Sequence, residues 1–363
     1  MLKLASLTVV ELSVPLVDPF VIASGRVDAT RCALVTAVLE DGSARFTGLG
    51  EAACLPPVTR EDQPDVLRAV AAAAPRLIGI KLDPDDLASL QAPLDAAFHG
   101  HLVSRAGVEL ALLDALARAK GVPLYTLLGG PEPGRAPELV TDITLPILPP
   151  ARMAELASQW SAKGFVSFKV KVGKDLQGDL DALAAVHRAV PGARFRLDAN
   201  GGFTADEAVR VLRAAEALGP VECYEQPCAE DDLAGMAQVA STSRAPVVAD
   251  ESVKHLAELG RVRDARAASG VNLKIAKSGG LLPALAIGRA ARAAGMSIMV
   301  GGMVETRLGM TAATHLAAAL GGVEFPDLDT AWLLRTDPFR GGYRESGPRY
   351  TLGSEPGLGI ELR

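Results

Sequence analysis

Aromatic residues and histidines are scarce in this chain: aromatics make up 4% of its 363 residues, and only five histidines are present. No two histidines have the HExxH spacing of zinc enzymes. The four cysteines are not spaced as zinc ligands either, so we expect free thiols in a reducing cytoplasm. If the protein is an enzyme, its lysines and carboxylates must carry the chemistry.

A long apolar run and a basic patch are also missing. No segment approaches the roughly 18–20 apolar residues that a membrane-spanning helix needs. The apolar N-terminus is interrupted by Glu11 and alternates as a β-strand does, which argues against a signal peptide. The formal net charge is −6. We therefore expect no nucleic-acid partner and no membrane partner.

The first third of the chain, residues 1–128, predicts an α+β domain. Its apolar-rich stretches are typical of an antiparallel meander, and three amphipathic helical patterns follow them. The expected strands cover residues 2–14, 32–40 and 45–52, and the expected helices lie near 60–76, 84–98 and 103–120. A Gly- and Pro-rich stretch at 129–138 then predicts a linker.

From residue 139 onward, short apolar strands alternate with Ala-rich helices. The strand candidates are 139–145, 166–171, 194–199, 221–225, 246–250, 271–276, 297–301 and 323–329. Charged residues at successive strand ends, from Lys171 to Lys274, are 27, 27, 25 and 24 residues apart, which is room for one strand and one helix. We predict an α/β fold with a (β/α)₇₋₈ TIM-like barrel over 139–330. A doubly wound sheet is the alternative, but no Gly-rich phosphate loop follows the first strand.

The ends of five consecutive barrel strands carry charged residues, and a βα barrel has its active site at these ends. They are Lys169 and Lys171, then Asp198, Glu225, Asp250 and Lys274. Buried charges are costly unless they are paired or bind a metal. Three converging carboxylates form a hard, all-oxygen site, which suits Mg²⁺ better than zinc; Mn²⁺ is the alternative.

The lysines suggest proton transfer. Lys169 and Lys171 are two residues apart on one strand, so both point to the same face, and their proximity is expected to lower a lysine pKa. Lys274 comes from the opposite side of the barrel. A substrate held over the metal would have a lysine on each face. This arrangement suits removal of a proton next to a carboxylate, because a divalent cation stabilises the enediolate that forms.

Five motifs resemble the muconate-lactonizing branch of the enolase superfamily. They are FKVKVG (168–173), RLDANGG (196–202), YEQP (224–227), ADES (249–252) and NLKIAKSGG (272–280). The resemblance implies Mg²⁺ on Asp198, Glu225 and Asp250, with Lys171 and Lys274 as the two acid/base groups. It also implies that 1–128 is a capping domain to which residues 332–363 return, and that the protein is a homo-oligomer.

Within this branch the sequence is most similar to the dipeptide epimerases. Asp327 and Asp329 in FPDLDT share one strand face and form an anionic pocket, whose natural partner is the ammonium group of a dipeptide. The alternative for this pair is a role in capping a surface loop. The alternatives for the enzyme are an N-acyl (N-succinyl) amino acid racemase, an o-succinylbenzoate synthase or a cycloisomerase, whose substrates lack the ammonium group.

Further residues are expected around the substrate. We expect Lys169 to contact the substrate carboxylate and Asn200 to orient the metal ligands by a hydrogen bond. Met303 lies in GGMVETRLG, which also resembles the dipeptide epimerases. Arg26, in the loop expected at 20–28, and Arg307 are cations that could select an acidic side chain; the alternative for each is a solvated surface charge. The preferred dipeptide side chain stays open at this point.

Overall fold

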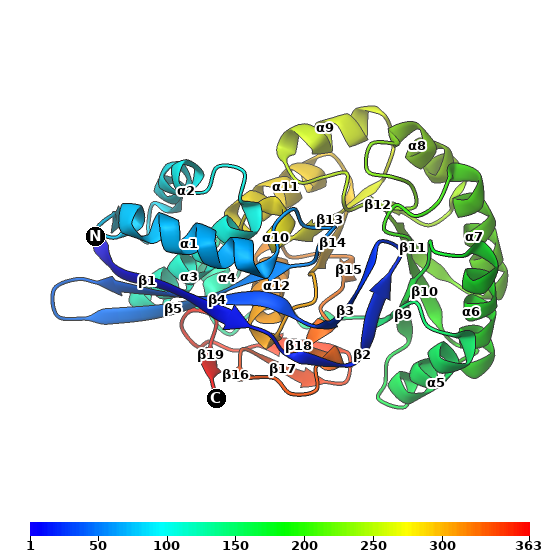
Figure 1. Cartoon of the computed structure of the whole chain (residues 1–363), viewed down its shortest axis with the longest axis horizontal. Coiled ribbons are helices and arrows are strands. Elements are labelled where there is room, and N and C mark those ends of the chain that lie inside the picture. Colours follow the sequence, from blue (N-terminus) through cyan, green and yellow to red (C-terminus); the bar gives the residue numbers. More distant parts are fainter.

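The computed structural model describes residues 1–363 and shows two parts (Figure 1). The N-terminal part contains a four-stranded antiparallel sheet in the order β5-β4-β1-β6. Its strands are β1 (Leu2–Leu12), β4 (Arg31–Glu40), β5 (Arg45–Cys54) and β6 (Lys81–Leu82). The helices beside it are α1 (Gln63–Leu77), α2 (Gln91–Ala97), α3 (Leu102–Lys120) and α4 (Leu124–Leu127), with the 3₁₀ turn η1 (Leu87–Leu90). The predicted meander and its three helical regions are confirmed.

Close packing of α3 on β5 depends on small residues. A Cβ atom at Gly50 would lie 2.1 Å from the carbonyl oxygen of Gly107 on α3, and one at Gly48 would lie 2.0 Å from that of Ala111. Both distances are far below van der Waals contact, so side chains are excluded at these positions.

The first turn of α1 is stabilised by a capping box, in which the side chains of Asp62 and Asp65 each accept a hydrogen bond from the other's backbone N–H.

The segment expected as a loop at 20–28 is instead part of a β-hairpin, formed by β2 (Pro15–Ile22) and β3 (Gly25–Ala29). Leu16, Phe20 and Ile22 of β2 are buried, so the hairpin is held by an apolar face as well as by its backbone hydrogen bonds. It extends from the N-terminal sheet toward the strands of the second part (Figure 1).

The second part is built on eight parallel strands in the order β8 to β15. They are β8 (Ile143–Leu145), β9 (Ser167–Lys171), β10 (Arg194–Asp198), β11 (Val221–Glu225), β12 (Val247–Ala249), β13 (Gly270–Lys274), β14 (Ser297–Gly301) and β15 (Phe325–Pro326). The connecting helices are α5 (Pro150–Ser161), α6 (Leu176–Ala189), α7 (Ala205–Leu218), α8 (Leu233–Thr242), α9 (Leu256–Asp264), α10 (Ile275–Ser278), α11 (Leu281–Ala293) and α12 (Arg307–Leu320). A 3₁₀ turn, η2 (Thr330–Leu333), follows β15 where an eighth α-helix would stand. The predicted TIM-like barrel is confirmed.

The first and last barrel strands, β8 and β15, do not pair through backbone hydrogen bonds. Side chains connect the segments next to these two strands. Asp329 accepts a hydrogen bond from the backbone N–H of Thr144, and Thr141 accepts one from the N–H of Leu328. The segment just after the last barrel strand therefore lies beside the start of the barrel.

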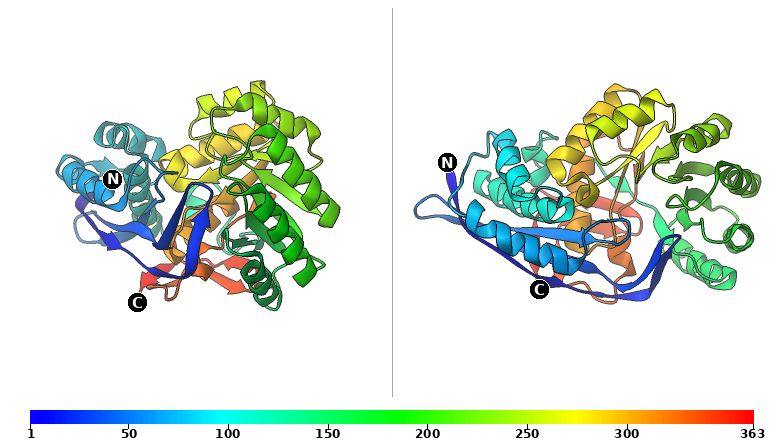
Figure 2. Two further views of the ribbon diagram at one scale, coloured as in Figure 1. Left: turned by 45° about the vertical axis from the view of Figure 1, so that its right-hand side comes forward. Right: turned by 45° about the horizontal axis from the view of Figure 1, so that its top comes forward.

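The C-terminal segment then returns to the N-terminal part (Figure 2). Its strands are β16 (Phe339–Gly341), β17 (Tyr343–Ser346), β18 (Arg349–Leu352) and β19 (Ile360–Leu362), and β18 also pairs with β7 (Leu139–Val140). The Leu358 N–H donates to Asp114 of α3, and Arg118 of α3 donates to the Ile360 carbonyl.

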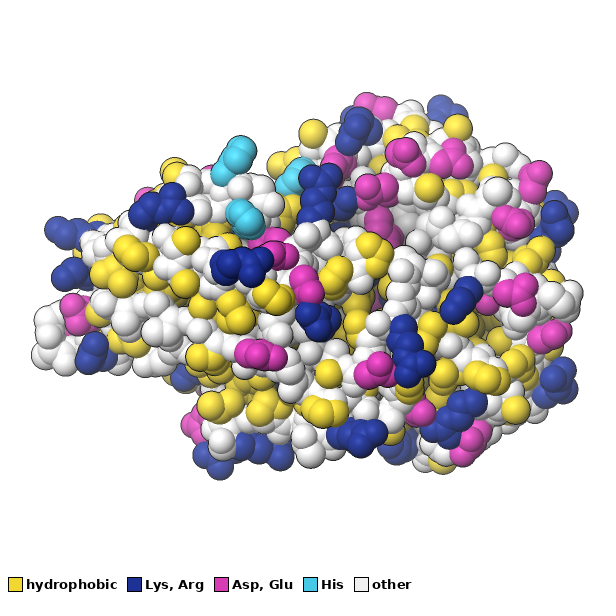
Figure 3. Space-filling view, in the orientation of Figure 1, with side chains coloured by type: hydrophobic (Ala, Val, Ile, Leu, Met, Phe, Trp, Pro, Cys, Tyr) yellow, Lys and Arg dark blue, Asp and Glu magenta, His cyan; other side chains and the backbone are white.

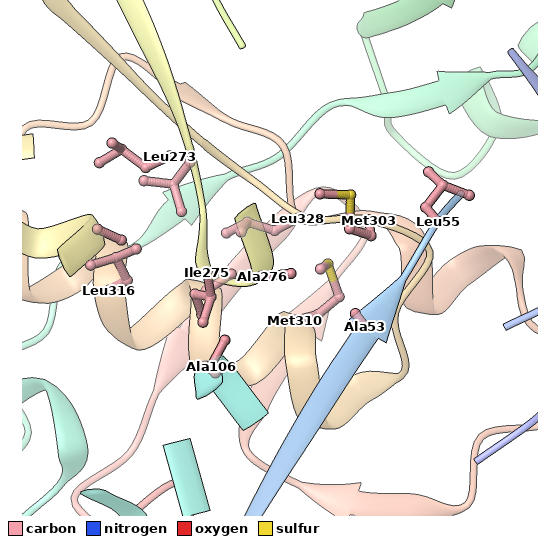
Figure 4. Packing of buried hydrophobic residues seen from close by; sticks show 14 of the residues in the cluster. Ala53, Leu55, Ala106, Leu273, Ile275, Ala276, Met303, Met310, Leu316 and Leu328 are labelled. Atoms are coloured by element: carbon pink, nitrogen blue, oxygen red, sulfur yellow. The ribbon is translucent and has the colours of Figure 1, made fainter. Parts of the chain in front are cut away.

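The two parts meet at a polar contact as well as an apolar one. Leu55, just after β5, and Met303 belong to the same buried hydrophobic cluster (Figure 4). Glu51 of β5 accepts hydrogen bonds from the Thr306 N–H and hydroxyl and from the Gly309 N–H, at the start of α12. These contacts hold the end of β5 against the loop that carries Met303.

The outer surface carries charges of both signs. Lysines, arginines and acidic residues alternate over the face shown in Figure 3 without a large patch of one sign. None of the helices has the length and apolar character required to span a membrane. The four cysteines are buried and unpaired, as expected.

Candidate active site

The charged strand ends come together in the barrel. Asp198 is the Cα partner of both Lys171 on β9 and Glu225 on β11, so the parallel register places the three residues side by side. Asp198 and Glu225 are 0% exposed, and Asp250, Lys169, Lys171 and Lys274 are also buried. All six side chains predicted from the strand ends therefore lie in one buried group.

Ion pairs connect the lysines to the carboxylates. Lys169 Nζ lies 3.1 Å from Asp198 and 2.6 Å from Glu225. Lys171 Nζ lies 2.5 Å from Asp198. Lys274 Nζ lies 2.6 Å from Asp250 and 3.7 Å from Glu225. Each carboxylate thus faces at least one ammonium group.

Burial and these ion pairs together shift the pKa values of the buried carboxylates and lysines. Burial would raise the pKa of Asp198 and Asp250, but the neighbouring lysines outweigh burial and hold both below their usual range. Burial and the charge of Asp198 raise the pKa of Glu225 to about 8. Although burial opposes it, the surrounding carboxylates raise the pKa of Lys169 and Lys274. The lowering of a lysine pKa expected from the proximity of Lys169 and Lys171 is therefore not seen at Lys169, because the carboxylates dominate.

The donor set fits Mg²⁺. Asp198, Glu225 and Asp250 stand at the ends of three neighbouring strands and supply only carboxylate oxygens, which Mg²⁺ prefers. Lys169 bridges Asp198 and Glu225, and Lys274 bridges Glu225 and Asp250, so the three carboxylates already share positive charge. A divalent cation would take over this neutralisation.

A second group of carboxylates lies next to the first. One carboxylate oxygen from each of Asp142, Asp327 and Asp329 lies within 4.8 Å of the others. Lys169 Nζ lies 2.7 Å from Asp327 and so connects the two groups. Asp327 and Asp329 are 4% and 0% exposed, so they do not cap a surface loop. Burial and the Asp327 charge raise the pKa of Asp329 to about 6.

A narrow cavity lies between the N-terminal part and the side of the barrel that carries the three lysines and Asp327. The barrel contributes Thr144, Asn200, Met303, Asp327 and the three lysines to its lining, while Phe20, Ile22, Leu55 and Val58 come from the hairpin and from the end of β5. Asn200 accepts a hydrogen bond from Lys171, and its amide donates to Glu251. Met303 is buried in the cavity wall, and its backbone N–H donates to Glu305.

Comparison with known proteins places this arrangement in a family. Residues 4–129 match the mandelate racemase / muconate lactonizing enzyme N-terminal domain, and residues 152–363 match the enolase C-terminal domain-like family. The chain is 39% identical to the L-Ala-D/L-amino acid epimerase of Populus trichocarpa, over 93% of this chain and 80% of that protein. It is 37% identical to the aromatic dipeptide epimerase of Herpetosiphon aurantiacus, over 97% and 96%.

A solved structure agrees over the whole chain. The dipeptide epimerase of Enterococcus faecalis, complexed with Mg and the dipeptide L-Leu-L-Tyr, superposes with a TM-score of 0.90 at 30% identity, covering 99% of both chains. The chain belongs to the mandelate racemase/muconate lactonizing enzyme family of the enolase superfamily. Within this family it is an isomerase of the dipeptide epimerase group.

Two arginines considered in the sequence lie outside the cavity of this epimerase-group protein. Arg26 is exposed on the β2–β3 hairpin and pairs with Asp28 at 2.8 Å. Arg307 pairs with Glu345, donates to the backbone of the C-terminal segment and stacks over Tyr343. Neither guanidinium lines the space next to the lysines.

The site also contains residues that the sequence analysis did not assign. Lys277 Nζ lies 2.6 Å from Asp250, and the Asn272 amide donates to Glu225 at 2.7 Å. Asn272 is two residues before Lys274, so the period of the strand could have revealed it. Lys277 lies on α10, and its contact depends on a turn of the chain that no strand pattern predicts.

Proposed function

We propose that the protein is a Mg²⁺-dependent dipeptide epimerase that moves a proton at the α-carbon of the C-terminal residue through an enediolate intermediate. The placement of the two lysines supports this proposal most directly. Lys171 ends β9 and Lys274 ends β13, four positions along the eight-stranded sheet, so their ammonium groups approach the carboxylates from opposite sides. A reaction that inverts a carbon centre needs one proton carrier on each face.

Asp198, Glu225 and Asp250 would hold the metal in this proposal. Bound there, Mg²⁺ would bind the substrate carboxylate and stabilise the negative charge of the enediolate. Carboxylates bound to a metal ion would no longer pair directly with Lys171 and Lys274, so these two amino groups would be free to exchange protons with the substrate. Lys169 stays beside the site as a positive charge for the substrate carboxylate. Asn200 would orient the metal ligand Asp198 through its backbone N–H and Lys171 through its side chain.

Asp327 and Asp329 would bind the substrate's ammonium group. Both are buried beside the lysines, and Asp327 lines the cavity. The pair shares a single lysine, Lys169, with Asp198 and Glu225, so it keeps excess negative charge in a buried site. A substrate that brings a positive charge is therefore favoured over one that does not. This pair is the feature that disfavours the N-succinyl amino acid racemase, o-succinylbenzoate synthase and cycloisomerase alternatives.

Exchange of the α-hydrogen in D₂O tests the proposal. With Mg²⁺ present, we expect NMR to show loss of the α-proton signal of the C-terminal residue in L,L-dipeptides, followed by the appearance of the L,D-epimer. N-succinyl amino acids, measured in parallel, should exchange at least about 100-fold more slowly because they bring no positive charge to the buried carboxylates. Exchange only in the N-succinyl compounds would instead support the racemase alternative.

The side chain of the epimerised residue is proposed to be apolar. The hairpin and the segment just after β5 contribute the apolar side chains of Phe20, Ile22, Leu55 and Val58 to the cavity. Every cation in the lining already pairs with a carboxylate. A glutamate side chain would therefore be buried without a partner.

We expect kcat/KM for L-Ala-L-Leu to exceed that for L-Ala-L-Glu by about 100-fold. L-Ala-L-Gln is the control, because it keeps the size of glutamate and removes its charge. The variant Arg26→Ala should leave the activity toward L-Ala-L-Leu unchanged. Preferred turnover of L-Ala-L-Glu that is lost in Arg26→Ala would show that Arg26 enters the cavity and selects an acidic side chain.

A further inference from the structure

Asp142 is a buried carboxylate that none of the roles above uses. It lies immediately before β8 and is 0% exposed. One of its oxygens accepts a hydrogen bond from Arg196 at 3.0 Å, whereas the other, Oδ1, has no hydrogen-bond partner. Oδ1 of Asp329 is buried without a partner as well. Unpaired carboxylate oxygens in a protein interior cost free energy, so two of them in one cluster need an explanation.

The carboxylates of the cluster lie close enough together for one ammonium group to contact all three. Three acceptors around one tetrahedral ammonium, each about 2.8 Å from the nitrogen, lie about 4.6 Å from one another. The carboxylate oxygens of Asp142, Asp327 and Asp329 lie within 4.8 Å of one another. An ammonium group has three N–H donors, so each carboxylate can accept one of them.

The charge balance points the same way. Two cations, Lys169 and Arg196, pair with carboxylates of the cluster, and both also pair with acidic residues outside it. Lys169 also pairs with Asp198 and Glu225, and Arg196 also pairs with Glu222 at 2.7 Å. Negative charge is therefore left over in the cluster. Burial raises the pKa of Asp142 well above its usual range, and the charges of Asp327 and Asp329 add to this effect.

We propose that Asp142 is the third acceptor for the α-ammonium group of the substrate and thereby determines the preference for peptides with a free N-terminus. This inference rests on the proposed function, because it presumes a dipeptide substrate. Asp142 would extend the Asp327/Asp329 pair to three acceptors, while Arg196 holds its second oxygen in place.

The variant Asp142→Asn tests this role with a matched pair of substrates. L-Ala-L-Leu and N-propionyl-L-Leu differ at the amino group, and the ratio of their kcat/KM values measures the preference for it. We expect this ratio to fall roughly 10- to 100-fold in Asp142→Asn, through a higher KM for the dipeptide. Asparagine keeps the size of the side chain and an acceptor for Arg196. A merely structural role would slow both substrates alike, and an unchanged ratio would overturn the proposal.

A second measurement does not depend on the variant. In a crystal structure of the unmodified protein with Mg²⁺ and L-Ala-L-Leu, the ammonium nitrogen should lie within about 3.2 Å of an Asp142 oxygen. A nitrogen held by Asp327 and Asp329 but beyond hydrogen-bond distance of Asp142 would contradict the inference. If the unmodified protein exchanges no dipeptide at all, the proposed function is wrong. If it exchanges dipeptides but Asp142 does not contact the ammonium group, only the role of Asp142 is wrong.

Discussion

Replacing Lys171 or Lys274 with alanine is expected to abolish epimerisation, with kcat falling about 10³- to 10⁴-fold in each variant. Inversion needs one lysine to remove the α-proton and the other to return a proton on the opposite face, so neither can compensate for the other. Both ammonium groups already contact the carboxylates that would hold the metal. The loss should therefore appear in kcat more than in KM.

The same variants can show which lysine serves which face. In D₂O, a protein with one remaining lysine can still exchange the α-proton of one epimer without inverting it. We expect Lys171→Ala and Lys274→Ala to retain slow exchange with opposite epimers, measured by NMR on L-Ala-L-Leu and L-Ala-D-Leu. Lys174→Ala, an exposed lysine just after β9, is the control and should keep full activity. Epimerisation by either lysine variant at more than a tenth of the normal rate would contradict the two-base arrangement.

Removal of divalent cations is expected to reduce the exchange of dipeptides at least about 10³-fold, because the enediolate charge would lose its stabilisation. Adding Mg²⁺ should restore the rate. The fold should survive the removal, since Lys169, Lys171, Lys274 and Lys277 neutralise the three carboxylates by direct ion pairs.

Activity after dialysis against a chelator, far-UV circular dichroism and Mg²⁺ titration by calorimetry measure these effects. Asp250→Asn should weaken Mg²⁺ binding strongly, whereas Glu230→Gln, a surface carboxylate that pairs with Lys254, should not. Undiminished exchange in the presence of excess chelator would refute the metal-dependent proposal.

Much of the site was predictable because the relevant patterns are local. Lys169 and Lys171 alternate along one strand, and the regular interval between strand ends indicates a parallel array whose C-terminal ends must meet. Asp198 then lies beside Lys171 and Glu225 through the parallel register alone. The buried state of Asp327 and Asp329 follows from the same geometry, since they directly follow the last strand.

Other features depend on contacts between distant segments. The 20–28 region becomes a hairpin because its apolar face packs against other parts of the protein, which its own sequence does not reveal. Arg26 and Arg307 could not be placed in advance, since a long side chain turns toward whichever partner the fold offers. These partners are Asp28 and Glu345.

The sequence by itself determined the barrel, the order of its strands and the identity of six charged residues at their ends, because strand periodicity and parallel topology are short-range properties repeated along the chain. Only the tertiary structure decided which charges share a partner. Asp142 lies 54 residues from Arg196 and joins Asp327 and Asp329 across the gap between the first and last strands. Electrostatic interactions of this kind depend on distance in space and on burial, and neither can be obtained from distance along the chain.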